Sequence, residues 1–322
     1  MAPEISIVCA ADERFAMPLA VMLRSAAATC SRPVRAFVLS NELSDRAKRE
    51  IEAACNRHPR PPAIEWLDAE TDYLRDAPKG LSHLSRATYL RFAIGRLISQ
   101  SVRRIIYLDC DLLVVRDITP LWDMPMEDNT IRAVRDFWTP AVGQPNALAY
   151  CISEIGIDPS HPMFNAGVLL IDLDAYRQEH VEDRCVEFIG RWAKHIRSAD
   201  QDALNGVLWN RWKPLDFQWN VQTGAWEDFK SSALLDATQK AALRDVDPAI
   251  LHFSGANKPW NSGLRSPRCE QYVRSVGDSG WFGKTGFQMW KARRAAVCIR
   301  SAALNWFASF QARRRQASGS QV

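Results

Sequence analysis

Short aliphatic runs alternate with amphipathic segments over the first third of the chain. Three runs have the composition of buried strands, at residues 4–10, 34–40 and 63–69. Segments with helical spacing lie at residues 17–30, 43–55 and 85–98, before strand composition returns at residues 103–110. Ser44 is placed to cap the second of these helices. This alternation predicts βαβ units and a mostly parallel sheet flanked by helices, an α/β fold.

The second half of the chain has fewer strand signals and longer loops. FNAGVLLIDL, at residues 164–173, is a strand pattern, and residues 181–194 and 198–209 have helical patterns. Residues 212–220 and 249–260 are aromatic and rich in loop formers. The stretch SVGDSGWFGKTG, at residues 275–286, is rich in glycine and serine and is typical of a boundary. The sequence therefore predicts a domain over residues 1–280 and a tail over residues 281–322.

Length and composition predict a folded globular protein. Of the 322 residues, 47% are hydrophobic, and length alone suggests about two domains. No apolar run approaches the roughly 18 residues of a membrane span, and the N-terminus lacks the pattern of a signal peptide. The eight cysteines include no C-x-x-C pair. Their scatter indicates reduced thiols in the cytoplasm rather than a disulfide framework or a zinc site.

Charge is distributed unevenly between the body and the end of the chain. Eight basic residues and no acidic residue follow Asp278: Lys284, Lys291, Arg293, Arg294, Arg300, Arg313, Arg314 and Arg315. Because the whole chain carries +4, the residues up to Asp278 carry a net charge of −4. A mildly acidic body is thus followed by a basic tail.

The tail also alternates its basic residues with Trp, Phe and Leu. Trp290, Val297 and Leu304 stand at heptad spacing, and Trp306, Phe307 and Phe310 add apolar bulk. One interpretation is an interfacial segment that binds an anionic membrane surface and holds the protein on the inner face of the cytoplasmic membrane. The other is a C-terminal helix docked on the body. No nucleic-acid recognition motif accompanies the basic residues, so we expect no nucleic acid partner.

Two acidic residues interrupt the aliphatic stretch IIYLDCDLLVV, residues 105–115. An extended backbone places the carboxylates of Asp109 and Asp111 on the same side of a strand. A buried, unpaired charge is costly, so the pair requires solvent or a partner. A hard divalent cation would offset the repulsion and attract a diphosphate. Because D-x-D also occurs by chance, a solvated strand end remains the alternative.

A second candidate cluster lies in LHFSGANKPW, residues 251–260. His252 can offer an imidazole nitrogen to a borderline metal such as Mn²⁺, although a lone histidine after an apolar run is more often a core residue. Gly255 allows the backbone to approach a phosphate closely, and Lys258 adds a positive charge. Together these residues are typical of half of a metal–diphosphate site.

Several motifs in one order resemble glycosyltransferase family 8, the retaining hexosyltransferases that use nucleotide-sugar donors. The likeness is greatest to the bacterial lipopolysaccharide and lipooligosaccharide α-galactosyltransferases. It extends nearly from end to end and is carried by AADERF, HLSRATYLRF, YLDCDLLV, LWDMP, FNAGVLLIDL, DQDALNG and HFSGANKPW. The resemblance implies a GT-A fold, a UDP-hexose donor, Mn²⁺ with Mg²⁺ as the alternative, and a glycan or glycolipid acceptor.

The resemblance also assigns site residues. It implies that Asp109, Asp111 and His252 are metal ligands and that Asp200 and Gln201 lie at the reacting sugar. The other positions that it places around the donor are Ala10, Ala11, Asp12, Arg91, Cys110, Asp136, Asn165, Ala166, Gly255 and Lys258. It implies retention, with Gln201 near the anomeric carbon and Asp200 holding sugar hydroxyls. Arg14 departs from the family pattern, which has a small polar contact to uridine at that position.

Each of these residues also has a structural explanation that the sequence leaves open. Asn165 could satisfy a turn, and Arg91 could form a surface ion pair on a helix. Asp200 and Asp202 could occupy the solvated first turn of a helix, and for Asp202 and Asp136 the residues alone favour this solvated interpretation. The residues Asp117, Asp123 and Asp172 are expected on the surface or in turns.

Three classes of function compete for the same pattern. The first is a metal-dependent transferase that moves galactose or glucose to a lipopolysaccharide-type glycan. The second is a non-catalytic nucleotide-sugar-binding protein, for which Gln201 and Lys258 would have no use. The third is a nucleotidyl- or phosphotransferase, but the chain has no Walker loop.

Overall fold

The computed structural model describes most of the chain. The described residues are 4–40, 43–69, 86–222, 237, 240–241, 246–255, 257–261 and 266–297. The predicted tail is therefore described only up to residue 297, and Leu304, Trp306, Phe307 and Phe310 lie outside the described residues.

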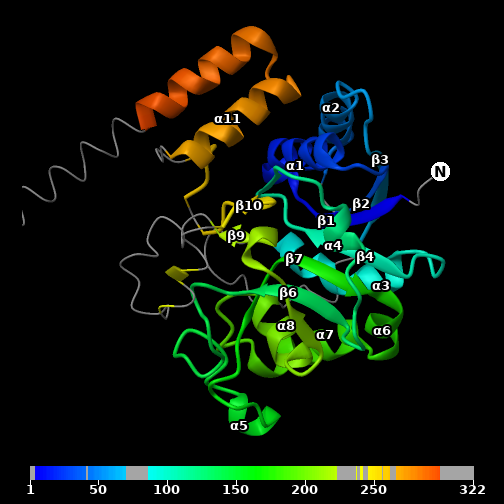
Figure 1. Cartoon of the computed structure of the whole chain (residues 1–322), viewed down its shortest axis with the longest axis vertical. Helices are drawn as coiled ribbons and strands as arrows, with labels where there is room; N and C mark the ends of the chain where they lie inside the picture. Colours follow the sequence, from blue (N-terminus) through cyan, green and yellow to red (C-terminus); the bar gives the residue numbers. More distant parts are fainter. Residues whose placement is uncertain are drawn as a thin grey trace, which may run out of the picture.

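A seven-stranded mixed sheet forms the centre of the molecule (Figure 1). Its strand order is β3-β2-β1-β4-β7-β6-β8. The bounds, in that order, are Ala63–Asp68, Val34–Ser40, Ile5–Ala10, Arg104–Leu108, Phe164–Asp172, Ile131–Arg135 and Trp212–Pro214. Strand β7 runs antiparallel to both of its neighbours, and the other adjacent pairs are parallel. The predicted α/β fold with a mostly parallel mixed sheet is confirmed.

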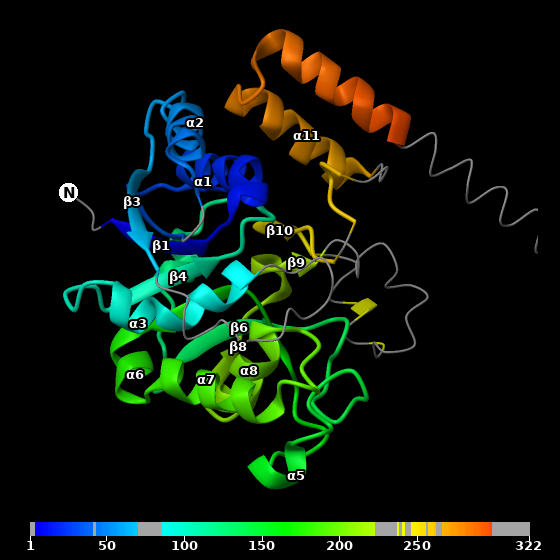
Figure 2. The same ribbon diagram turned by 180° about the vertical axis from the view of Figure 1, so that it is seen from behind.

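Helices cover both faces of this sheet, as Figures 1 and 2 show from opposite sides. On one face lie α1 (Ala16–Thr29) and α2 (Asp45–Cys55). On the other lie η3 (Arg86–Ala93), α3 (Ile94–Leu97), α6 (Leu173–Gln178), α7 (Val181–Trp192) and α8 (Asp200–Leu208). The short elements η1 (Glu13–Phe15), α4 (Thr119–Trp122), α5 (Ile152–Ile155) and η4 (Phe217–Trp219) lie in connections. Ser44 caps α2 as predicted, because its side chain accepts from the Ala47 N–H.

Alternate side chains of the central strands belong to two separate cores. Ile5, Ile7 and Cys9 of β1 face α1 and α2, whereas Val8 faces η3 and the helices of the opposite side. This is the pattern of a sheet buried on both faces, which explains why its strands read as continuous apolar runs. The seven described cysteines are unpaired and buried, and Cys298 lies outside the described residues.

Residues 105–115 do not form the single strand that their composition suggested. Strand β4 ends at Leu108, residues 109–111 turn, and β5 (Leu112–Val114) joins a second sheet of order β5-β10-β9. Strand β10 (Ile250–His252) comes from the segment 249–260 that was expected to be loop-rich, as β8 comes from the segment 212–220, and β9 (Val221–Gln222) follows directly after the latter. The aspartate pair therefore lies at the junction of the two sheets, where the turn lets both carboxylates leave the apolar layer.

Residues 85–98 also differ from the amphipathic helix that was expected. They form the 3₁₀ helix η3 and a single turn of α3, and Ser85 lies outside the described residues. The tighter 3₁₀ winding changes which side chains share a face. It turns Thr88 and Arg91 toward the end of β4, where they meet Asp109 and Asp200.

The glycine-rich stretch at residues 275–286 contains the end of one helix, a turn at residues 280–282 and the start of a second helix. Helix α11 (Pro267–Ser279) ends at Gly280, whose φ of 63° is left-handed, and a second helix occupies residues 283–297. The second helix packs back on α11: an alanine-sized side chain at Gly277 would lie 2.9 Å from the Phe287 ring. Residues 283–297 are thus docked on α11, while the predicted domain boundary near residue 280 stays a prediction.

Candidate active site

Two adjoining cavities at the carboxyl end of β4 contain all the predicted site residues. The larger, of about 750 Å³, is lined by Arg91, Asp109, Asp111, Asp136, Asn165, Ala166, Asp200, Gln201, His252, Gly255 and Lys258, among others. The smaller, of about 90 Å³, adds Ala10, Ala11, Asp12 and Cys110. Both cavities are lined by Thr88, Arg91, Asp109, Asp111 and Lys258. The carboxyl end of strands in an open α/β sheet is the expected place for a ligand.

Asp109, Asp111 and His252 converge although they are far apart in sequence. His252 pairs in register with Leu112 in the small sheet, which places the imidazole next to the turn that carries both aspartates. One ligand atom from each residue lies within 4.8 Å of the other two. Two carboxylates and one imidazole form a donor set suited to Mn²⁺ and similar divalent ions. The residues present therefore fit the cation that the family resemblance implies.

The orientation of His252 is fixed by a residue that the sequence analysis did not single out. Its Nδ1 lies 2.9 Å from Oδ1 of Asn220, which is fully buried. The amide oxygen can only accept, so the Nδ1–H of His252 donates to it, and Nε2 faces Asp111 at 3.4 Å from Oδ1. Gly167 gives the ring its space, because an added Cβ would lie 2.4 Å from His252 Cε1.

Lys258 neutralises Asp111 at the mouth of the larger cavity. Its Nζ donates to Asp111 Oδ2 at 2.5 Å and to the Phe253 carbonyl at 2.8 Å. Burial would raise the pKa of Asp111, but Lys258 and His252 hold it well below its ordinary value. Asp111 is therefore a carboxylate at any physiological pH and is available as a ligand. Gly255, three residues earlier, has a φ of 83°, a left-handed conformation that suits glycine.

Arg91 is buried between two carboxylates rather than exposed in a surface ion pair. Its guanidinium lies 2.6 Å from Asp109 Oδ1 and 2.9 Å from Asp200 Oδ2, and Nη1 donates to the Ala166 carbonyl at 2.8 Å. Burial would lower the pKa of Arg91, but Asp109 and Asp200 raise it. Burial raises the pKa of Asp200 to about 6, although Arg91 opposes this shift. Arg91 thus links the turn at residues 109–111 to the start of α8.

Asp136, Asn165 and Gln201 form one buried hydrogen-bond network. Asp136 Oδ2 accepts from Asn165 Nδ2 at 3.0 Å and from Gln201 Nε2 at 3.2 Å. Gln201 Oε1 accepts the Ala166 N–H at 3.1 Å. Asn165 Oδ1 accepts from Asn220 Nδ2 at 2.8 Å, which connects the network to His252. The solvated interpretation of Asp136 was wrong, because this residue is 3% exposed and burial raises its pKa.

The turn before α8 has a strained backbone. Ala199 has φ 50° and ψ −120°, a conformation that costs a residue other than glycine about 1–3 kcal/mol. The solvated interpretation of Asp200 and Asp202 was also wrong, since they are 4% and 0% exposed. Burial raises the pKa of Asp202 to about 6, against the effect of its bonds to the Arg197 and Ser198 N–H groups. In contrast, Asp117, Asp123 and Asp172 lie in turns, caps and surface pairs as expected.

Asp12 in the smaller cavity is paired with Arg14, which is not among the residues that line the cavity. Asp12 is 8% exposed, and its Oδ2 accepts from Arg14 Nε at 3.2 Å and Nη2 at 3.0 Å. Arg14 itself is exposed, so it caps the carboxylate from the solvent side. Cys110 donates its thiol to the Ala10 carbonyl at 3.2 Å and holds the turn against β1.

Several lining residues were missed by sequence reasoning. Thr88, Trp138, Asn146, Arg197 and Ser198 line the larger cavity, and Asn220 contacts His252 from behind. Thr88 stands three residues before Arg91, and its hydroxyl donates to Asp200. Its place within the TYLRF motif was the one signal that could have found it.

One known protein family matches most of this chain. A family model described as Glycosyl transferase family 8 matches residues 6–263. The chain belongs to glycosyltransferase family 8. The resemblance seen in the sequence motifs is thereby confirmed, and so is the GT-A fold, which the structural likeness below supports.

Two curated proteins and one solved structure resemble the chain over most of its length. General stress protein A of Bacillus subtilis strain 168 is 32% identical over 281 residues, which cover 85% of this chain and 94% of that protein. The lipopolysaccharide 1,3-galactosyltransferase of Salmonella typhimurium strain LT2 is 24% identical over 288 residues, 87% of this chain and 80% of that protein. The structure of the galactosyltransferase LgtC in complex with donor and acceptor sugar analogues has a TM-score of 0.73 at 27% identity, over 85% of this chain and 95% of that one.

Proposed function

We propose that the chain is a metal-dependent retaining hexosyltransferase. It moves galactose or glucose from a UDP-sugar to a glycan acceptor of the lipopolysaccharide type, with Mn²⁺, or Mg²⁺ in its place, held by Asp109, Asp111 and His252. Family membership supports the transferase class, and the Salmonella relative and LgtC support a galactosyl donor. The other residues that line the two cavities would contact the donor.

One observation carries this proposal. The cation site, the Lys258 ammonium and the pair Asp200–Gln201 open into the same cavity of about 750 Å³. A pyrophosphate needs positive charge on one side, and a hexose needs hydrogen-bonding groups on the other. The smaller cavity beside Asp12 continues toward β1 and would receive the uridine.

The residues of this chain would act mainly through charge and position. When bound, a divalent cation would supply Lewis-acid stabilisation of the charge that develops on the diphosphate. Lys258 lies beside the same position and would add a second positive charge. Asp200, held by Arg91 and Thr88, would bind hydroxyls of the hexose. Gln201 would lie at the anomeric carbon, where its carboxamide is held by Asp136 and the Ala166 N–H.

Donor turnover tests this proposal directly. With Mn²⁺ present, we expect UDP release from UDP-galactose or UDP-glucose to exceed release from the N-acetyl analogues by at least about tenfold, since one poorly placed group costs about 1.4 kcal/mol or more. The measurement is coupled detection of UDP with and without an oligosaccharide acceptor. Tight donor binding without any UDP release would instead identify a non-catalytic sugar-nucleotide-binding protein.

The stereochemistry of the product gives a second measurement on the same reaction. Retention requires the first-formed product to carry an equatorial anomeric proton, as the α-linked donor does. Proton NMR of the transfer product distinguishes this proton from the axial one, because the new glycosidic linkage does not mutarotate. An axial proton would mean inversion, which is incompatible with the proposed use of Gln201 and Asp200.

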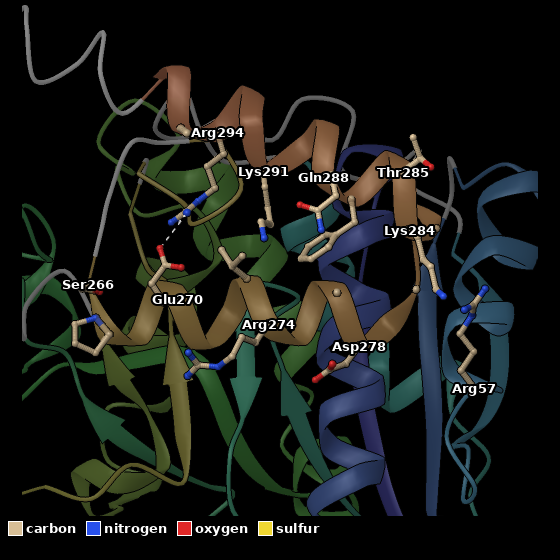
Figure 3. Close-up of a pocket in the computed structure, with 17 residues that line it drawn as sticks. Arg57, Ser266, Glu270, Arg274, Asp278, Lys284, Thr285, Gln288, Lys291 and Arg294 are labelled. Carbon is tan, nitrogen blue, oxygen red and sulfur yellow. Dashed lines mark hydrogen bonds and ion pairs between the residues drawn. The ribbon is translucent and has the colours of Figure 1, made fainter.

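The second helix at residues 283–297 supports peripheral attachment to an anionic membrane. Met289 and Val297 are 55% and 42% exposed, and Lys284, Lys291 and Arg293 are exposed on the same helix. A groove of about 1450 Å³ lies between this helix and α11, with Arg57, Arg274, Lys284 and Lys291 along it (Figure 3). No described helix is both long enough and apolar enough to cross a membrane. The proposed location is the cytoplasmic side of the membrane that carries the acceptor lipid.

Charge reversal in the full-length chain tests this attachment. Changing Lys284, Lys291 and Arg293 to glutamate should weaken binding to phosphatidylserine vesicles by at least about 100-fold, since each basic residue at such a surface is worth about 1 kcal/mol. Sedimentation with vesicles gives the affinity. Phosphatidylcholine vesicles and Lys194→Glu are the controls, because Lys194 is exposed just after α7 and does not line this groove. Equal sedimentation of the variant and the original chain would exclude this helix as the anchor.

A further inference from the structure

The turn that leads into α8 combines two unfavourable features. Gln201 N–H donates to the Ser198 carbonyl at 3.0 Å and closes a four-residue turn. Ala199, its first central residue, has φ 50° and ψ −120°. This is the conformation of a type II′ turn, which normally has glycine at that position. An L-residue adopts it only when its surroundings impose it.

The side chain of Asp202 supplies that constraint. Its Oδ2 accepts the N–H groups of Arg197 and Ser198, at 2.8 and 3.2 Å, immediately before the strained residue. Its Oδ1 is buried without a hydrogen-bond partner among the described residues. An incompletely satisfied buried carboxylate is unfavourable in itself, so its presence requires an explanation other than the stability of the core.

Both the strained backbone of Ala199 and the bonds of Asp202 determine where the next two residues, Asp200 and Gln201, lie. Asp200 follows Ala199 directly and reaches Arg91 at 2.9 Å, and Gln201 reaches the Ala166 N–H at 3.1 Å. A relaxed backbone at Ala199 would rotate the first turn of α8 and move both side chains away from these partners. Asp202 itself does not line the cavity, so it acts on the site only through the backbone.

We propose that Asp202 is a positioning residue for sugar transfer. Its buried carboxylate clamps the backbone at Arg197 and Ser198, imposes the left-handed conformation on Ala199, and so sets Asp200 and Gln201 toward the hexose. This inference rests on the proposed function of Asp200 and Gln201. It goes beyond that function in assigning the cause of their orientation to a residue that touches neither donor nor acceptor.

An ordinary helix cap makes different predictions. An acidic residue in the first turn stabilises a helix through capping bonds and the helix dipole, and its loss would lower the melting temperature with little change in kcat. A positioning residue affects kcat through the conformation of Ala199. Glycine adopts that conformation without strain, so a glycine at position 199 separates the two roles.

The test is a double-mutant cycle with UDP release as the assay. In the original chain, Asp202→Ala should lower kcat by about 100-fold with little change in KM for the donor, because a misplacement of about 1 Å costs that much. In an Ala199→Gly background, the same substitution should cost less than about tenfold, since the turn no longer needs to be clamped. Calorimetric affinity for UDP and Mn²⁺ should be the same in all four proteins, because Asp109, Asp111, His252 and Lys258 are untouched.

Asp172→Ala is the matched control. Asp172 caps α6 by accepting the Ala175 N–H, so its loss should lower the melting temperature without a comparable loss of kcat. If Asp202→Ala does not fold, Asp202→Asn is used in the same cycle, because it keeps the volume and weakens the clamp. Equal losses of kcat in both backgrounds, with all proteins folded by circular dichroism, would overturn the proposal. Absence of UDP release from the original chain would instead refute the proposed function, whatever the cycle shows.

Discussion

Asp111→Asn is expected to lower metal-dependent donor turnover by at least about a thousandfold. A bound cation stabilises the charge that develops in the transition state by several kcal/mol, and each step of about 1.4 kcal/mol corresponds to tenfold in rate. The substitution removes a carboxylate whose oxygen lies in the three-residue cluster with Asp109 and His252. Calorimetry with Mn²⁺ and UDP should show the loss of affinity independently of turnover. Full activity of the original chain in excess chelator would contradict the cation role.

The control for this variant follows from the contact between Asp111 and Lys258. Because Lys258 is 7% exposed and donates to Asp111, Asp111→Asn also removes a carboxylate that is paired with a buried ammonium, which is destabilising. Asp111→Asn combined with Lys258→Met removes both charges and should recover much of the lost melting temperature. It should not recover the affinity for Mn²⁺. If the double variant regained metal binding, the carboxylate of Asp111 would not be a ligand.

The sequence predicted the fold well where local pattern decides it. Apolar runs and amphipathic segments correctly placed β1, β2, β3, α1 and α2, because β1 and β2 are buried on nearly their whole length and the two helices bury one apolar face against the sheet. It failed at residues 105–115, where aliphatic composition continues through a change from one sheet to another. Composition reports burial, and both sheets are buried, so the turn at the aspartates has no compositional signal.

The residues that the motifs assigned to the candidate site do lie together, because all of them line the two cavities. Other lining residues, such as Trp138, Asn146 and Arg197, and the electrostatics of the cavities were not predicted. Burial of Asp136 and Asp202 could not be predicted, because acidic residues near helix starts and strand ends are usually solvated and their partners come from distant segments. Asn220 was missed for the same reason: its role depends on the pairing of β9 with β10.

Arg91→Met should be the most destabilising substitution in the site. It leaves Asp109 and Asp200 facing each other with no charge between them, and removing one partner of a buried pair costs about 3–5 kcal/mol. Without Arg91, the pKa of Asp200, already raised to about 6 by burial, should rise further. Thermal and denaturant unfolding without metal would measure the loss, and sugar transfer should be abolished as well.

The effect of pH on Arg91→Met follows from the sign of the Asp200 shift. A carboxyl group whose pKa is higher in the folded state than in the unfolded state binds more protons when folded, so stability rises as pH falls through the folded pKa. The stability gap between Arg91→Met and the original chain should therefore be largest near pH 8 and narrow toward pH 5. Arg103→Met is the control, because Arg103 pairs with Asp174 while its side chain is 81% exposed, and it should leave stability unchanged at both pH values. A gap that widened on acidification would mean that Arg91 does not stabilise the ionised form of Asp200.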